Sequence, residues 1–153
     1  MAFTPLVLVV MNVVYAASAY PFGKLADSMS HTRLLSVGLV VLIAADCALA
    51  YSNHWISMSV GIVLWGLHMG LTQGLLATMV ADSAPEDLRG TAFGFFNLVS
   101  GVALLFASGL AGLIWDRFGA SFTFLTGTLF CMIALVMIAA APSAAKLAAE
   151  QNR

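Results

Sequence analysis

Five long apolar runs, separated by short gaps that hold most of the charges, occupy most of this chain. They cover approximately residues 3–20, 34–51, 56–81, 91–115 and 120–141. Each run is about 18 to 26 residues long, which is enough for a helix to cross ~30 Å of hydrocarbon. A water-soluble domain built from these runs would expose far more apolar surface than such domains tolerate. The sequence therefore predicts an all-α, polytopic membrane bundle of five transmembrane helices.

The composition leaves room for this bundle and little else. The chain is 61% hydrophobic and 8% charged, and its net charge of −1 gives no basic face for nucleic acid. We expect one domain, a bundle over residues 1–141, followed by a short cytoplasmic tail over 142–153. Cys47 and Cys131 lie inside apolar runs without metal-ligand spacing, so we interpret them as small hydrophobic residues. Neither a metal nor a cofactor is predicted.

Basic residues gather in alternate gaps. Every Lys and Arg except Arg117 lies in the first gap, in the third gap or in the C-terminal tail. The positive-inside rule places these segments in the cytoplasm. We therefore expect a protein of the plasma membrane, in bacteria the inner membrane, with its N-terminus outside and its C-terminus cytoplasmic. An outside N-terminus with no soluble domain before it is a first indication that upstream helices are missing.

Four charges lie at unfavourable helix ends on that same side. Asp27 and Asp82 lie at the C-terminal ends of predicted helices, where the helix dipole is negative. Arg33 and Arg89 lie near the N-terminal ends of the next helices, where the dipole is positive. The charges could pair with one another, or water and lipid headgroups could solvate each one. The gaps are too short to carry these groups far from the helix ends, which favours pairing.

The third gap also contains a predicted helix start. Residues 83–86 read Ser-Ala-Pro-Glu, which fits a capping box. Ser83 would be the N-cap, Glu86 would reach back to it, and Pro85 would stand in the first turn, where its missing N–H costs nothing. The pattern predicts that the fourth helix begins near Ala84.

The gaps carry motifs that resemble those of one transporter family. The first gap resembles the G-x-L-A-D-x-x-G-R-[RK] loop signature of the major facilitator superfamily, through Gly23, Leu25, Ala26, Asp27 and the terminal Arg33. The third gap, residues 81–90, looks like the segment between the tenth and eleventh helices of that family. The fourth gap is similar to its outer D-R-x-G turn, with Asp116, Arg117 and Gly119. The resemblance implies helices eight to twelve of a twelve-helix transporter.

The first-gap motif departs from the signature at several positions. Ser28 stands in place of Arg, Ser30 in place of Gly, and His31 and Thr32 in place of a basic pair. Such erosion is expected in the second copy of this loop.

The resemblance also implies a conformational gate. Asp27 would clamp against Arg89, with Asp82 and Glu86 as further charge partners, in one state of an alternating-access cycle and release it in the other.

Small residues form a stripe on the third run. Gly66, Gly70 and Gly74 recur at four-residue spacing, which in lipid allows close approach of helix backbones. Tight static packing and motion during gating are both compatible with this stripe.

Polar residues inside the runs are candidate contacts for substrate or protons, because lipid does not solvate them. Asp46 is the only acid well inside a run. It is either a proton-coupling carboxylate or an interfacial acid that reaches headgroups or caps a neighbouring helix. The resemblance assigns its run to the ninth helix, outside the central cavity, which favours the second interpretation.

His68 and Thr72 share one face of the run that resembles the cavity-lining tenth helix. His68 is either a hydrogen-bonded core residue or a contact for substrate or protons. Gln73 lies about 140° further round the helix, so it cannot face the same point as His68. Asn12 and Asn97 are weaker candidates, for which we favour interhelical hydrogen bonds.

The predicted function is secondary active transport of a small solute by alternating access, with the proton as one candidate coupling ion. The sequence contains no enzyme motif, so we do not expect an enzyme. The expected partners are the lipid bilayer, the solute and, for a fragment of a transporter, the missing N-terminal half. The alternative is a small membrane protein that binds other helices through its glycine stripes and transports nothing by itself.

Overall fold

The computed structural model describes residues 4–26 and 28–140, which form an all-α bundle without strands. Its five α-helices are α1 (Thr4–Ala26), α2 (His31–Ala50), α3 (Trp55–Asp82), α4 (Arg89–Phe118) and α5 (Ala120–Ala140). A short 3₁₀ helix, η1 (Glu86–Leu88), precedes α4. All five α-helices are long and apolar enough to span a membrane. The predicted fold class is confirmed, while Asp27 and the predicted tail lie outside the described residues.

Several helices extend beyond the apolar runs. α1 continues through Pro21 to Ala26, so the first part of the predicted gap is helical. Neighbouring groups in a membrane protein can satisfy the carbonyl that a proline leaves free. The connection that remains is short, because α2 begins at His31 with Ser30 as its N-cap. The Leu25 carbonyl closes α1 by accepting from the backbone N–H groups of Ser28 and Met29, at 3.1 and 3.0 Å.

The predicted capping box is wrong. Ser83 is the C-cap of α3, and its hydroxyl donates to the Met79 carbonyl at 2.6 Å. Pro85 has φ −54° and ψ 153° and precedes η1, so α4 begins only at Arg89. A proline disfavours helical backbone at the residue before it, which prevents a helix from starting at Ala84.

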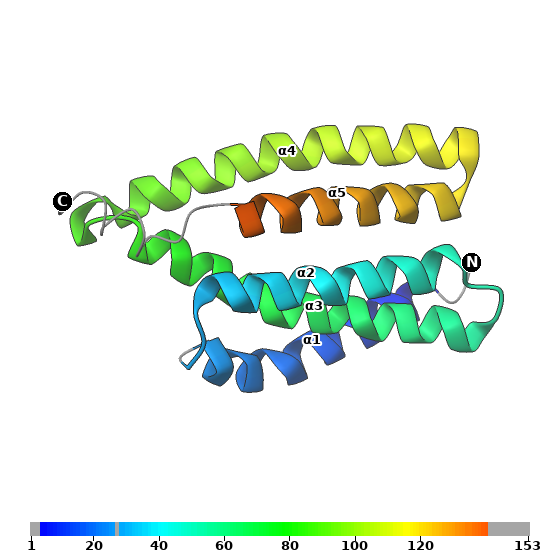
Figure 1. The fold of residues 1–153 in the computed structure, drawn as a ribbon, viewed down its shortest axis with the longest axis horizontal. Coiled ribbons are helices and arrows are strands. Elements are labelled where there is room, and N and C mark those ends of the chain that lie inside the picture. Colours follow the sequence, from blue (N-terminus) through cyan, green and yellow to red (C-terminus); the bar gives the residue numbers. More distant parts are fainter. Residues whose placement is uncertain (1–3, 27, 141–153) are drawn as a thin grey trace.

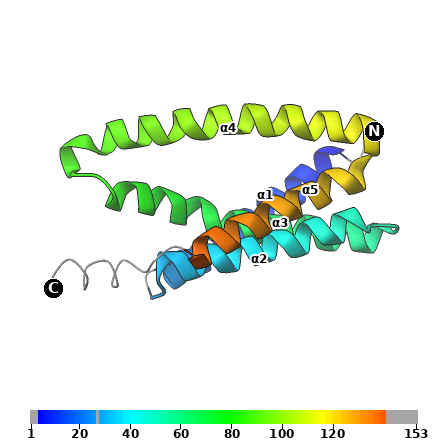
Figure 2. The same cartoon turned by 45° about the horizontal axis from the view of Figure 1, so that its top comes forward.

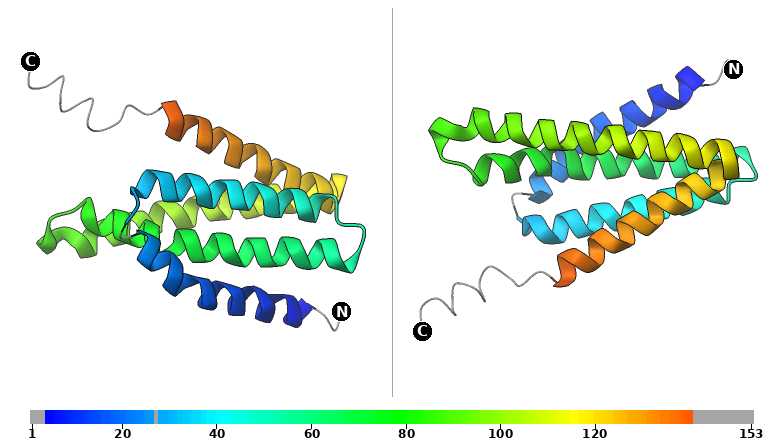
Figure 3. Two further views of the ribbon diagram at one scale, coloured as in Figure 1. Left: turned by 60° about the horizontal axis from the view of Figure 1, so that its bottom comes forward. Right: turned by 90° about the horizontal axis from the view of Figure 1, so that it is seen from above.

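α3 is the central helix of the bundle. It packs against α1 on one side and α2 on the other, and α5 runs along α2 (Figures 1 and 3). α4 lies outside these helices, contacts α5 and α3 sparsely, and has no buried residue (Figure 2). Phe124 of α5 connects them through edge-to-face contacts with Trp65 and Trp115, at centroid distances of 6.3 and 6.4 Å.

The connections alternate between two ends of the bundle. Residues 28–30 and 83–88 form one end, called here the Ser28 end, and residues 51–54 and 119 form the other, called the Gly119 end (Figure 1). The main apolar cluster, formed by Leu34, Leu71 and Leu75, lies toward the Ser28 end. Elsewhere large apolar side chains such as Leu105 and Phe106 are more than 70% exposed, as lipid-facing residues of a membrane bundle would be.

Candidate functional site

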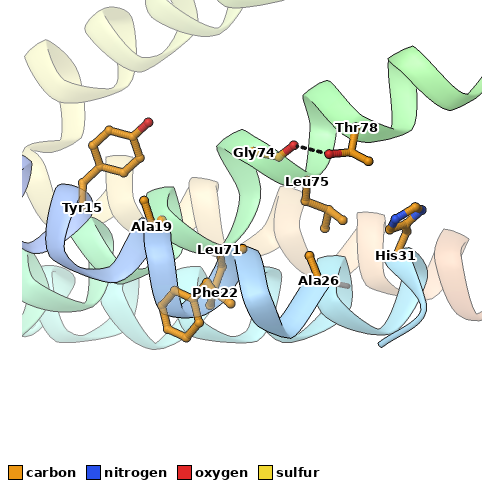
Figure 4. A pocket seen from close by; sticks show the side chains of 11 residues that line it. Tyr15, Ala19, Phe22, Ala26, His31, Leu71, Gly74, Leu75 and Thr78 are labelled. Carbon is orange, nitrogen blue, oxygen red and sulfur yellow. Dashed lines mark hydrogen bonds between the residues drawn. The ribbon is translucent and has the colours of Figure 1, made fainter. Parts of the chain in front are cut away.

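A cavity of about 400 Å³ opens between α1 and α3 toward the Ser28 end. Figure 4 shows Tyr15, Ala19 and Phe22 of α1 on one side and Leu71, Leu75 and Thr78 of α3 on the other. His31, the first residue of α2, lies at one end of the cavity. This volume lies within the range of small-molecule sites, which is about 300–1,000 Å³.

The glycine stripe explains why the cavity is there. A Cβ added at Gly66 would lie 2.8 Å from the Met11 carbonyl oxygen, and one at Gly70 would collide with the Ser18 hydroxyl, so α1 and α3 are in close contact at these positions. A Cβ at Gly74 would meet nothing within 4 Å, and Gly74 lines the cavity instead. The two helices therefore touch at Gly66 and Gly70 and separate at the next glycine.

Two residues of the loop motif line the same cavity. Gly23 and Ala26, on the last turns of α1, belong to its wall, while the exposed Leu25 contributes its carbonyl to the helix end. Arg33 is not part of this wall and lies in an open groove between α2 and the last turns of α5. The fifth motif residue, Asp27, lies outside the described residues.

The predicted charge partners gather around the start of α4 without pairing among themselves. Asp82, Glu86 and Arg89 are all exposed. The Arg89 Nε donates to the carbonyl of Ala81 at 3.2 Å, so the guanidinium lies against the negative end of α3. No ion pair joins these three residues to any part of the chain that the structure describes. The pairing of Asp27 with Arg89 stays a prediction.

His68 and Thr72 face α2 and not the α1–α3 cavity. The His68 Nδ1 lies 2.8 Å from the carbonyl oxygen of Gly38, and the Thr72 hydroxyl donates to the His68 carbonyl at 2.9 Å. Gly38 leaves room for them, because a Cβ there would lie 2.6 Å from the Thr72 Cγ2. His68 thus has a hydrogen-bond partner on a neighbouring helix, as expected if it is a core residue. A contact of His68 with substrate or protons stays a prediction.

Three other polar candidates are exposed on the bundle surface. Asn12 of α1 donates to the Leu8 carbonyl of its own helix at 2.8 Å. Gln73 of α3 and Asn97 of α4 are also exposed. All three stand within membrane-spanning segments, where lipid offers no hydrogen bonds.

Asp46 lies in the contact between α2 and α5. It is 6% exposed, and its Oδ2 lies 2.7 Å from the position that a Cβ on Gly127 would occupy. The carboxylate therefore faces α5 and is distant in sequence and in packing from the α1–α3 cavity.

The turn that carries the D-R-x-G motif joins α4 to α5 through a single residue. Gly119 has φ 88° and ψ 176°, and its N–H donates to the Trp115 carbonyl at 2.9 Å. Backbone in this region is adopted almost only by glycine. Asp116 and Arg117 are exposed in the last turn of α4.

Sequence reasoning missed several residues that pack against the candidates: Ser18 against the glycine stripe, Gly38 against Thr72 and Gly127 against the buried Asp46. Ser18, which fits against Gly70, donates its hydroxyl to the Tyr15 carbonyl at 3.0 Å. Gly38 and Gly127 make room for Thr72 and Asp46. A glycine inside an apolar run is a signal of close approach, but the sequence alone does not say which neighbour approaches.

No group of three or more His, Cys, Asp or Glu residues that could hold a metal occurs within residues 4–26 and 28–140. Apolar side chains and glycines line most of the cavity, together with the hydroxyl groups of Tyr15 and Thr78 and the imidazole of His31.

Comparison with known proteins agrees with this description. The sequence matches the Major Facilitator Superfamily over residues 2–152. An uncharacterized MFS-type transporter of Methanocaldococcus jannaschii is 31% identical over 88% of this chain and 34% of its own length. A lysosomal dipeptide transporter of Bos taurus is 34% identical over 72% of this chain and 24% of its own length. A hexose transporter of Saccharomyces cerevisiae is 27% identical over 63% of this chain and 18% of its own length.

The chain therefore spans about a third or less of the length of these relatives. No solved structure gives a significant match. The family match covers nearly the whole chain, and its five apolar helices suit a bilayer. This chain belongs to the Major Facilitator Superfamily and is an integral membrane protein.

Proposed function

We propose that this chain forms part of a secondary active transporter that moves a small polar solute across the membrane by alternating access. The observation that carries the proposal is the exposure of Asn12, Gln73 and Asn97 within membrane-spanning helices. Polar side chains inside a bilayer face protein or a water-filled pathway, because lipid cannot satisfy them. These residues therefore favour a larger assembly in which further helices enclose a solute pathway.

The relatives support the same conclusion. The share of their length that this chain covers, 34% or less in the three cases above, leaves room for the N-terminal half of such a transporter. In this proposal the missing half packs against the exposed polar faces and completes the pathway. The alternative, a membrane protein that only binds other helices, predicts no solute movement in any assembly.

The α1–α3 pair is the proposed moving part. The two helices touch at Gly66 and Gly70 and are separated by the cavity near Gly74, so α1 can tilt about the glycine contact. Closing the Ser28 end would bring Gly23 and Ala26 toward α3. In the closed state Asp27, next in the chain, would reach Arg89. In this structure the Arg89 Nε instead donates a hydrogen bond to the Ala81 carbonyl.

The substrate class follows only in outline from the relatives. Their names include a dipeptide transporter and a hexose transporter, both of which carry polar solutes rich in hydrogen-bonding groups. Hydroxyl and amide side chains on α1, α3 and α4 suit such solutes, and the proton is the proposed coupling ion.

Transport assays with the gate variant Asp27→Asn test this proposal. The full-length transporter is reconstituted in liposomes and given labelled dipeptides and hexoses, with and without a proton gradient. A partly exposed ion pair contributes ~1 kcal/mol, so its loss changes the balance of two states about fivefold. We expect turnover to fall about fivefold while substrate binding is retained, and Asp116→Asn at the opposite end to leave turnover unchanged.

Equal turnover in Asp27→Asn and the parent protein would contradict the gate. Absence of uptake for both solute classes, in the presence of the N-terminal half, would instead favour the helix-binding alternative. Liposomes that contain only residues 1–153 should show no uptake, because the pathway lacks the helices that would cover the exposed polar residues.

A further inference from the structure

Asp46 is a buried acid that the proposed solute pathway does not use. Its side chain is 6% exposed, and Ala45 before it is fully buried against α3, where a Cβ on Gly61 would lie 3.3 Å from the Ala45 carbonyl oxygen. α2 is therefore held between α3 and α5 at this point, and Asp46 occupies the α5 side.

The contact with α5 is shaped for the carboxyl group. A Cβ at position 127 would lie 2.7 Å from Oδ2 and 3.5 Å from the carboxyl carbon of Asp46. Any residue larger than glycine would force the carboxyl group away, so the side chain lies in a space that Gly127 provides. Cys131, one helical turn further along α5 and 8% exposed, closes the same face.

Nothing in the described parts of the chain neutralises a charge at Asp46. No hydrogen bond or ion pair reaches its carboxyl oxygens from residues 4–26 or 28–140. α5 carries no Asp, Glu, His, Lys or Arg, and the basic or imidazole groups of α2, His31 and Arg33, stand at its opposite end.

The remaining titratable groups near this seam do not pair with Asp46. His54, in the connection after α2, is exposed and belongs to the capping box of α3. On α3, His68 is bonded to Gly38, two turns along α2 from Asp46. Cys47 has the Thr128 hydroxyl as its neighbour, at 3.9 Å, and Cys131 is a thiol without charge complementarity to a carboxylate. Asp116 and Arg117 belong to α4, which packs against α5 and not against the Asp46 side of α2.

An ionised carboxylate in this position is unfavourable, because the 6% exposed side chain has lost most of its hydration and gains no partner from the described residues in exchange. A metal cation is a poor remedy, since Ca²⁺ takes six to eight oxygen ligands and Mg²⁺ a full octahedron. As side-chain oxygen ligands the described seam offers one carboxyl group and the Thr128 hydroxyl, and no group of three His, Cys, Asp or Glu residues occurs in the described residues. A single proton suffices, because it converts the carboxylate into a neutral acid.

We propose that the Asp46 carboxyl group is a proton-binding site in the α2–α5 contact, occupied while the two helices are packed together. Release of the proton to water leaves a carboxylate that requires hydration, so deprotonation favours separation of α5 from α2 at the Gly119 end. This site is distinct from the α1–α3 cavity and does not depend on the proposed transport activity.

Infrared spectroscopy of the full-length protein in bilayers of ether lipids, which have no ester carbonyl to overlap with a carboxyl band, tests the proposal directly. A protonated carboxyl group has a C=O stretch that a carboxylate lacks. An exposed Asp, with an ordinary pKa near 3.9, contributes no such band at pH 7. We expect a band at pH 7 that disappears in Asp46→Asn and persists in the matched control Asp82→Asn. A wild-type spectrum without the band, or a band that survives Asp46→Asn, would overturn the proposal.

A second pair of variants tests the role of the α5 contact. In Gly127→Ala the added methyl group displaces the carboxyl group toward water, so the band at pH 7 should be lost although Asp46 is still present. Gly112→Ala is the control, because a Cβ at Gly112 meets nothing within 4 Å. A band of undiminished intensity in Gly127→Ala would show that the proton is not held in the α2–α5 contact.

Discussion

At the scale of single residues, Gly119 is the position where backbone conformation alone decides which residue is allowed. Its φ of 88° and ψ of 176° make it the only positive-φ residue within 4–26 and 28–140. We expect Gly119→Ala to destabilise the folded protein by about 1–3 kcal/mol, because the substitution forces a side chain into a region that excludes it. Denaturant unfolding in mixed micelles measures this change.

The control for that variant lies two turns earlier on the same helix. A methyl group added at Gly112 would meet open space, and the backbone there is helical, so Gly112→Ala should be neutral or slightly stabilising. Equal loss of stability in the two variants would show that the backbone of Gly119 is not the cause.

The sequence motif at residues 116–119 identified Gly119 as a turn residue, but not its backbone angles. The same limit applies to His68, which the sequence places on one face of a helix with Thr72. Only the packing of α2 against α3 decides that this face meets Gly38. Partners of a polar residue inside a membrane are set by tertiary contacts that a single sequence does not contain.

At the scale of helices, the sequence predicted their number, type and approximate place, because a run long enough to cross a bilayer has few alternatives to a helix. It was less informative about their ends. Hydropathy could not show that α1 continues through Pro21 to Ala26, since the last residues of that helix are less apolar than the rest. A capping pattern also misled at Ser83, where the proline two positions later excludes the helical start.

The glycine stripe gives a prediction at this scale, because its three members have different surroundings. Gly66→Ala places a methyl group 2.8 Å from the Met11 carbonyl oxygen and 3.0 Å from the Val14 Cβ, so α1 must move away from α3. Overpacking of this kind costs about 1–3 kcal/mol. We expect that loss in Gly66→Ala and none in Gly74→Ala, measured by unfolding in the same micelles.

Equal effects at the two glycines would mean that spacing along the helix, and not contact with α1, determines the role of the stripe. The sequence could not separate these cases. All three glycines share the four-residue spacing, and only the divergence of α1 from α3 turns the last one into a cavity wall.

At the scale of the whole molecule, the two ends of the bundle should lie on opposite sides of the membrane. The Ser28 end is flanked by Lys24, Arg33 and Arg89, whereas Arg117 is the only Lys or Arg of residues 4–26 and 28–140 that lies near the Gly119 end. Basic residues near helix ends are retained in the cytoplasm. We therefore propose that the Ser28 end is cytoplasmic, in the inner membrane if the protein is bacterial.

Cysteine labelling in intact cells checks this orientation. In a protein with Cys47 and Cys131 replaced by Ala, single cysteines are introduced by Ser28→Cys, Ser83→Cys or Asn53→Cys, all at exposed positions. A membrane-impermeant maleimide should label only the Asn53→Cys variant until the membrane is permeabilised. The opposite pattern would reverse the orientation and leave the bundle intact. Labelling of Ser28→Cys and Asn53→Cys from the same side would contradict a membrane-spanning α2, because the two positions lie at opposite ends of that helix.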